Sequence, residues 1–201
     1  MAYASWVTPN KQSGNGNDTV SWTGSAHTGR VARTTTATFS ASGVESKTLT
    51  INQAGKAEFV TIDSTAAVAK AGGSVTITGT SNSSKLTFSL TGTNGIGLVL
   101  PATYTANSAS TTNGAAITGD PGATQQYTFS ITFANIAENT TIAALVSQLT
   151  VTANNGDTAT CEITQAAGDA YLSISPTTIN LTAAGTAESV TVTSNTSWTI
   201  S

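Results

Sequence analysis

Apolar and polar residues alternate along most of the chain, in short runs separated by Gly, Asn and Ser. A period of two residues places successive side chains on opposite faces of a β-strand. The pattern predicts strands over residues 36–40, 47–53, 75–78, 86–90, 127–133, 148–152, 158–165, 190–193 and 197–200. Short strands with turn residues every ~8–12 positions are typical of an antiparallel sandwich. The helix-like stretch 141–146 is too short to change that class.

The sequence contains an internal repeat. Residues 37–54 align without a gap with residues 149–166, so that Leu49 falls on Cys161. Residues 59–62 align with 171–174 in the same way, and Leu86 falls on Trp198. The period of about 112 residues has the length of one sandwich domain rather than of a solenoid repeat.

The repeat predicts three segments. Residues 57–168 form a complete immunoglobulin-like module with a long loop at 102–126, and residues 1–55 form the C-terminal part of a module that lacks its opening strands. Residues 170–201 carry opening strands only. We therefore expect an all-β protein of tandem immunoglobulin-like sandwiches, antiparallel, with one module split between the two ends of the chain.

Half a sandwich exposes strand edges and core residues, so the split module needs completion. The C-terminal strands could return to residues 1–55 of the same chain, or they could insert into another copy, as in donor-strand complementation. A third alternative is that the chain is a fragment and the missing strands lie outside it. The short linker at residues 55–57 favours modules that run end to end, which disfavours completion within one chain.

Composition narrows the classes of partner. Charged residues make up 8% of the chain, about a fifth is Thr, and 38% is hydrophobic, which suffices for small cores. With a net charge of −3 and no basic patch, nucleic acid is not an expected partner. The chain has no apolar run of the ~20 residues that a membrane helix needs, and no basic region followed by an apolar run, so we expect neither a membrane span nor a signal peptide.

Candidate chemistry is sparse. His27 is the only histidine, and we interpret it as a solvated loop residue. Cys161, the only cysteine, alternates in phase with apolar neighbours and is expected in the core. The ten acidic residues form no credible catalytic pair, and calcium at Asp120 or Asp157 is disfavoured because residues 154–157 fit a hairpin turn. We expect no catalytic residues, no metal, no cofactor and no enzymatic activity.

Aromatic side chains are the remaining candidates for ligand contact, because a flat ring can stack on a sugar. Trp198 and Trp22 fall on apolar strand positions and are expected in the core. Tyr104 lies in the long polar loop, where long loops are often functional. The candidate ligand or partner contacts are Tyr104, Asn107, Asn113 and Trp6.

Several short segments, taken in order, resemble the BACON domain family (Bacteroidetes-associated carbohydrate-binding, often N-terminal). They are residues 194–198, 6–9, 14–16, 29–33, 51–53 and 163–165. The resemblance covers nearly the whole chain, but the middle module departs from it, with Leu86 where the family has Trp and with a much longer loop. The resemblance implies an immunoglobulin-like sandwich. It gives no glycan-site residues that could be placed on this sequence.

The family occurs in surface and secreted proteins of gut Bacteroidetes, and similar modules occur in virion proteins of their phages. We therefore expect a non-catalytic structural or adhesive protein on a virion surface, a capsid-decorating or fibre protein. Its partners would be copies of itself or other virion proteins, by strand complementation, and host or mucosal glycans. The alternative is a carbohydrate-binding accessory module of a Bacteroidetes cell-surface or secreted protein. The initial Met and the lack of a signal peptide favour the virion.

Overall fold

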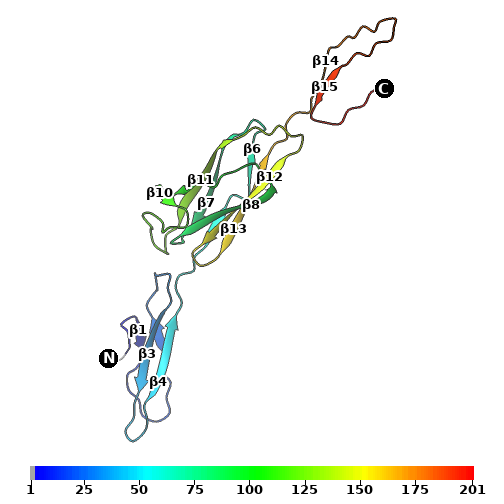
Figure 1. Ribbon diagram of the computed structural model, residues 1–201. Coiled ribbons are helices and arrows are strands. Elements are labelled where there is room, and N and C mark those ends of the chain that lie inside the picture. Colours follow the sequence, from blue (N-terminus) through cyan, green and yellow to red (C-terminus); the bar gives the residue numbers. More distant parts are fainter. Residues whose placement is uncertain (1–2) are drawn as a thin grey trace.

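The computed structural model describes residues 3–201, with the backbone alone at residues 93 and 94. The described residues form strands and connections without a helix, which confirms the all-β class. Three segments follow one another along an elongated molecule, and the N-terminal and C-terminal segments lie at opposite ends (Figure 1). The strands are β1 (Val7–Pro9), β2 (Trp22–Gly24), β3 (Arg33–Phe39), β4 (Lys47–Gln53), β5 (Val60–Ile62), β6 (Thr65–Val68), β7 (Gly73–Ser81), β8 (Leu86–Asn94), β9 (Thr103–Ala106), β10 (Ala109–Thr112), β11 (Tyr127–Ile136), β12 (Leu145–Ala153), β13 (Thr158–Gln165), β14 (Leu172–Ser175) and β15 (Thr191–Ser194).

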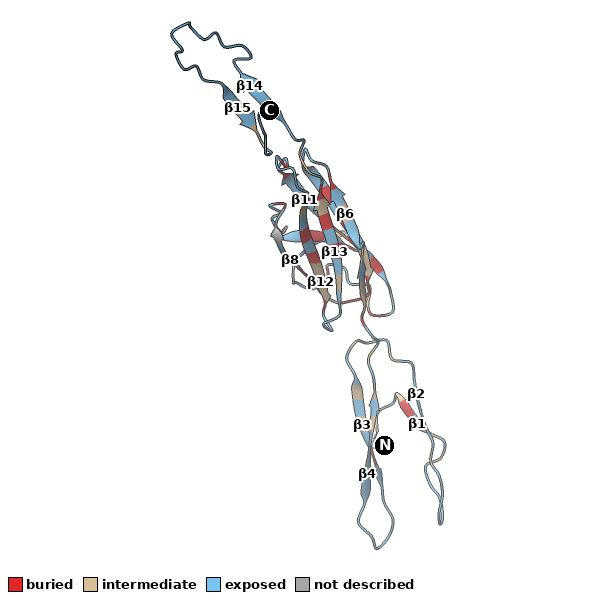
Figure 2. Cartoon of the chain, turned by 90° about the vertical axis from the view of Figure 1, so that its right-hand side faces the viewer, coloured by how far each residue is buried: buried red, intermediate tan, exposed pale blue. Residues whose placement is uncertain are grey.

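The middle segment is a two-layer sandwich. One sheet has the order β10-β9-β11-β7-β5 and the other has the order β6-β13-β12-β8. Successive side chains of a strand point to opposite faces of its sheet, so every second side chain of both sheets points inward. Buried residues concentrate in this segment (Figure 2). The core between the sheets includes Ile77, Leu86, Phe133, Leu149, Val151 and Ile163, all at most 1% exposed.

The opening strand of this sandwich changes sheets. β5 pairs with β7 in the first sheet, and β6 pairs with β13 in the second. The β6–β13 pairing is parallel, which differs from the purely antiparallel sandwich expected from the sequence. The chain keeps its direction as it passes from β5 in one sheet to β6 in the other. β6 therefore runs parallel to β13, the last strand of the module.

The segment expected as a long loop at 102–126 contains a hairpin. β9 pairs with β10, and β9 also pairs with β11 at the edge of the five-stranded sheet. Asn107 and Ser108 have φ angles of 48° and 63°, which is the conformation of a two-residue type I′ hairpin turn. The sequence concealed this hairpin because Asn-Ser replaces the usual Asn-Gly signal, and because its strands consist largely of Thr, Ser and Ala.

The two end segments are smaller. Residues up to 55 form two separate strand pairs, β1–β2 and β3–β4, and residues from 170 onward form one pair, β14–β15. Residues 197–200, expected as a strand, are irregular. A strand needs a neighbour for its backbone hydrogen bonds, and the equivalent strand β8 obtains them from β12. Among residues 3–201 nothing equivalent to β12 lies beside residues 197–200 (Figure 1).

Candidate functional site

The β3–β4 hairpin exposes an apolar face that the equivalent strands of the middle module bury. Leu49 on β4 is 37% exposed, and Phe39 on β3 is 44% exposed. Cys161 and Val151 hold the equivalent positions on β13 and β12, and both are 0% exposed. Residues 1–55 therefore present the inner face of a sandwich without the strands that cover that face in residues 57–168.

The equivalence extends to the hairpin register. Ala37 on β3 faces Leu49 on β4, just as Leu149 on β12 faces Cys161 on β13. Each residue is displaced along the chain by the same period of about 112 positions. The sequence repeat is thus a structural repeat, and the middle module shows what a complete version of the N-terminal segment contains.

A groove with a volume of about 640 Å³ lies against this open face. Trp22 packs edge-on against Tyr3 and Phe39, with ring centroids 5.2 Å and 6.5 Å apart. Charged side chains, among them Lys11 and Glu45, also line the groove. Protein–protein interfaces combine an apolar centre with a polar rim, so a groove with both apolar and charged lining suits a polypeptide partner. The apolar lining includes Tyr3, Val20, Trp22, Ala37, Phe39 and Val44.

At the other end of the chain, the β14–β15 hairpin reproduces the β5–β7 hairpin. Leu172 faces Ser194 in the first, and Val60 faces Ser81 in the second. The side chain of Asn195 accepts a hydrogen bond from the Tyr171 amide (3.0 Å) and donates one to the carbonyl of residue 169 (2.9 Å). Residue 82 makes the same two bonds to residues 59 and 57. The C-terminal segment therefore already has the local structure of an opening hairpin.

This C-terminal hairpin leaves its apolar side chains in solvent. Leu181 is 63% exposed, whereas the equivalent Val68 is 4% exposed. Trp198 is 47% exposed, whereas the equivalent Leu86 is 0% exposed. The expectation that Trp198 is a core residue is wrong for the single chain, because the strands that enclose Leu86 have no counterpart around Trp198.

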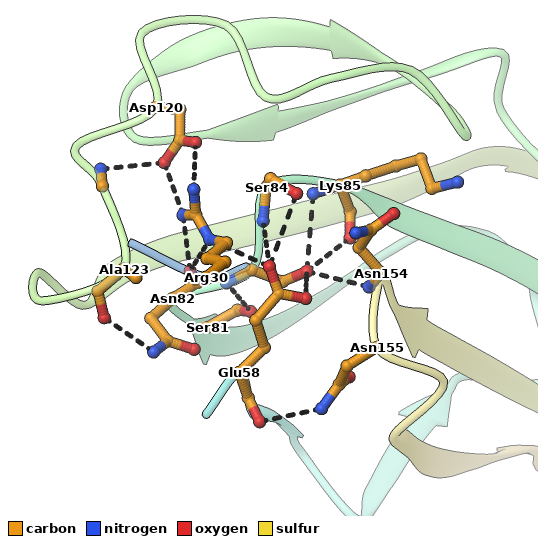
Figure 3. Close-up of polar contacts among 12 residues, drawn as sticks. Arg30, Glu58, Ser81, Asn82, Ser84, Lys85, Asp120, Ala123, Asn154 and Asn155 are labelled. Carbon is orange, nitrogen blue, oxygen red and sulfur yellow. Dashed lines mark hydrogen bonds and ion pairs between the residues drawn. The ribbon is translucent and has the colours of Figure 1, made fainter. Parts of the chain in front are cut away.

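Arg30 ties the N-terminal segment to the middle module (Figure 3). Its guanidinium forms a two-pronged ion pair with Asp120, at 2.7 Å and 2.8 Å, and its Nε lies 2.9 Å from Oε1 of Glu58. It also donates to the Asn82 carbonyl at 2.7 Å. Hydrogen bonding by Arg30 lowers the pKa of the Asp120 carboxyl, and the same contact raises the pKa of Arg30. These contacts place the two segments end to end.

Glu58 is the buried member of this cluster, at 6% exposure. Its carboxylate accepts hydrogen bonds from the Ser83 hydroxyl at 3.0 Å and from the Ser84 amide at 3.2 Å. A buried carboxylate is costly unless it is paired and hydrogen-bonded. Sequence analysis missed this cluster, because Arg30 and Asp120 are 90 positions apart in the chain.

The candidate ligand contacts are not assembled into one site. Tyr104 is 4% exposed and packs against Phe88, with ring centroids 4.8 Å apart, so its expected role as a sugar platform is wrong. Burial raises the pKa of its hydroxyl, which lies near the Leu86 backbone without a hydrogen bond of normal geometry. Its ring is buried because β9 joins the sheet.

The other candidates also have structural contacts. Asn107 occupies the β9–β10 turn. Asn113 hydrogen-bonds both the amide and the carbonyl of Phe88, at 2.8 Å and 3.1 Å, as a neighbouring strand would. Trp6 lies in the separate N-terminal segment, where the Arg33 guanidinium covers its ring at 4.5 Å. Asn107 is exposed, whereas Asn113 and Trp6 are half-buried, and the three residues lie in different parts of the molecule.

The only histidine and the only cysteine are both engaged in structure. Nε2 of His27 lies 2.7 Å from the Val31 carbonyl, and the Gly29 amide donates to its Nδ1 at 3.4 Å. Cys161 is 0% exposed, and burial raises the pKa of its thiol. Burial of the thiol opposes formation of the thiolate that a reactive cysteine requires.

The described residues bring together no three His, Cys, Asp or Glu side chains that could hold a metal ion. Asp120, considered above for calcium, is paired with Arg30, and Asp157 accepts a hydrogen bond from Asn155 at 2.8 Å. Within residues 3–201 there is no helix with the length and hydrophobicity to cross a membrane.

No curated protein matches the sequence. A family model matches the segment that carries the open face and the groove. Residues 1–54 match BACON, described as "Putative binding domain, N-terminal", and this segment therefore resembles a binding domain of that family.

Proposed function

We propose that this protein is a non-catalytic structural component of a virion surface. In this proposal it decorates the capsid or forms a fibre of a phage that infects gut Bacteroidetes, and it assembles through its immunoglobulin-like modules. The observation that carries the proposal is the uncovered inner face of residues 1–55, where Leu49 and Phe39 are exposed although their equivalents are buried. An apolar face of this kind marks a site of protein association.

The rest of the molecule supports an assembly role. The modules follow one another in an elongated row (Figure 1), which suits a protein that projects from a particle. Charged residues make up only 8% of the chain, and Thr-rich strand surfaces replace them. The BACON match over residues 1–54 supports a binding role for the segment with the open face.

A second candidate function follows from the same match. BACON domains are described as binding domains, and a carbohydrate-binding accessory module of a bacterial surface protein would use the same segment. Trp6 is the remaining aromatic candidate, but Arg33 already lies over its ring. The burial of Tyr104 removes the strongest sugar-stacking candidate of the middle module. The geometry therefore favours a polypeptide partner over a glycan.

Two measurements test the proposal. Antibodies raised against the full chain should label phage particles, seen by immuno-electron microscopy of particles from Bacteroidetes cultures. On a glycan array, the full chain should show no binding that depends on Trp6, so the native chain and the Trp6→Ala variant should give the same result. Labelling of bacterial cell surfaces instead of particles, together with a Trp6-dependent array signal, would establish the accessory-module function and overturn the virion assignment.

A further inference from the structure

We propose that the occupant of the open N-terminal module is the C-terminal segment, residues 170–201, of a second copy of this chain. The contact is head to tail, and each copy donates at one end and accepts at the other. This inference rests on the proposed assembly function and identifies the partner at its binding site.

The same interface already exists once inside the molecule. Within residues 57–168 the opening strands pack on the later ones: β7 pairs with β11, β6 with β13, and β8 with β12. Residues 170–201 repeat the opening strands, and residues 1–55 repeat the later ones. The intermolecular contact therefore extends an established packing arrangement rather than creating a new one.

The register of the donated strand at β4 follows from the middle module. There Ala66 on β6 lies beside Ile163 on β13, and Val68 lies beside Gln165. The equivalent residues at the split module are Ile179 beside Ile51, and Leu181 beside residue 53. Ile179 and Leu181 are 41% and 63% exposed in the single chain. Insertion covers both side chains and supplies β4 with the parallel neighbour that β13 has.

The last residues of the donor take the place of β8. In the middle module Phe88 faces Val151 across β8 and β12. The equivalent pair places Ile200 opposite Phe39, with Trp198 nearby over the open face. Residues 1–55 lack the insertion that packs Tyr104 against Phe88 in the middle module. The larger Trp198 fills the volume that this insertion occupies there.

The base of the donor is already formed, whereas residues 197–200 become a strand only on insertion. The β14–β15 hairpin already has the register of β5–β7, and Asn195 already holds its base. A preformed donor loses less conformational entropy on binding than a disordered one. The acceptor hairpin is preformed in the same sense, because β3–β4 has the register of β12–β13.

Geometry selects a second copy over the same chain. The N- and C-terminal segments lie at opposite ends of the molecule, with the middle module between them (Figures 1 and 2). A contact between unlike surfaces of two copies leaves one free acceptor and one free donor, so it propagates unless rotation closes a ring. The product is a filament in which every module is complete except the free acceptor at one end and the free donor at the other.

The first experiment is sedimentation velocity of the full chain over a range of concentrations. The native chain is expected to form dimers and longer species as concentration rises. Leu181→Asp places a charge in the new core and should shift assembly to at least ~100-fold higher concentration. Leu181 is exposed in the monomer, so this change does not unfold it. The matched control is Val99→Asp, at another exposed apolar residue (83%) outside the interface, and it should assemble normally.

Disulfide cross-linking between two variants, each with one engineered cysteine, tests which residue of the donor faces which residue of the acceptor. Thr87 on β8 faces Thr152 on β12, so Thr199 of one copy is expected to face Ser40 of the next. Chains with Ser40→Cys and chains with Thr199→Cys should form a disulfide-linked dimer on mixing under oxidising conditions. A mixture of Thr38→Cys with Thr199→Cys chains, displaced by two residues, should cross-link poorly.

A native chain that stays monomeric at every concentration would overturn the head-to-tail contact. Assembly unaffected by Leu181→Asp, or equal cross-linking in both cysteine mixtures, would also overturn it. If such a monomer still labels phage particles, the virion function stands and another polypeptide completes the open module. If the filament forms but particles are not labelled, the contact stands and the virion function fails.

Discussion

His27 closes the same loop in the N-terminal segment that Asn139 closes in the middle module. Nε2 of His27 lies 2.7 Å from the Val31 carbonyl, and the Nδ2 of Asn139 donates to the Ala143 carbonyl at 2.8 Å. The acceptor atoms of both side chains receive an amide hydrogen from two residues further along the chain. In the tautomer with its proton on Nε2, the His27 ring offers one donor and one acceptor, as the Asn139 amide does. The imidazole and the amide each place one donor and one acceptor at similar positions, so both side chains can hold the same loop.

This relationship predicts the outcome of two substitutions. His27→Asn should keep the loop, because the amide offers the same donor and acceptor, whereas His27→Ala should cost about 1 kcal/mol in local stability. Hydrogen exchange at the Gly29 amide measures the difference. Thr28→Ala, a change at the neighbouring loop residue, is the control. Equal exchange rates in the Asn and Ala variants would contradict the role assigned to His27.

The Arg30–Asp120 pair predicts a pH-dependent junction. The folded-state pKa of Asp120 is lowered by Arg30, so the contribution of the pair is complete above the unfolded value of ~3.9 and is lost as pH falls through the lowered folded value. Asp120→Asn should loosen the junction at neutral pH as well. Small-angle scattering would detect the loosening as a broader range of maximum dimensions.

A matched control for the junction is Asp18→Asn. Asp18 also has a lowered pKa, through its contact with Lys11, but it lies away from the junction and is well exposed. Its loss should leave the scattering unchanged, since exposed pairs contribute little. Arg30→Ala should be more damaging than Asp120→Asn, because it leaves buried Glu58 without its cation. A junction as rigid in Arg30→Ala as in the native chain would rule out this account.

Two tyrosines in the middle module should respond oppositely to loss of the hydroxyl. The Tyr127 hydroxyl donates to the Ser83 carbonyl at 2.7 Å, so Tyr127→Phe leaves a buried acceptor unpaired and should cost about 1–3 kcal/mol. The Tyr104 hydroxyl is buried and unpaired, so Tyr104→Phe should be neutral or stabilising. The free energies of unfolding of the two variants can be compared from the urea-induced unfolding transition of the middle module. A greater loss in Tyr104→Phe than in Tyr127→Phe would show that the Tyr104 hydroxyl has a partner.

Cys161 should be inert in the native protein. Its side chain is fully buried, and desolvation raises the pKa of its thiol, which opposes formation of the reactive thiolate. A thiol reagent at neutral pH should label it only as fast as the middle module unfolds. Addition of urea should accelerate labelling in parallel with unfolding. The engineered Thr199→Cys thiol, at an exposed position, provides the fast-reacting control.

Much of the fold could be predicted from local pattern. The period-two alternation predicted β3, β4, β12 and β13, because their apolar positions point to one face and turn residues flank them. The repeat then aligned one hairpin with the other, and their registers agree. Prediction failed at β9 and β10, where few large apolar residues mark the inward face, and at 197–200, where the pattern is present but the neighbouring strand is not.

For the candidate sites, too, the sequence showed local features but not the contacts between distant segments. The sequence correctly marked residues 102–126 as unusual, but it could not show that Tyr104 points into the core, since that depends on β9 joining the sheet. It also could not show that Arg30, Glu58 and Asp120 meet, because an ion-pair cluster is formed by segments distant along the chain.

By itself the sequence determined most of the strand pattern and the period of about 112 residues, and it predicted that the two end segments are complementary. These are properties of alternating side chains and of repetition, and both can be seen in one dimension. The tertiary structure alone decided which faces are covered. Leu49 and Cys161 occupy equivalent positions, yet one is 37% exposed and the other 0% exposed. Burial depends on which strands are present in space, and only the three-dimensional arrangement shows that the chain leaves its N-terminal module open.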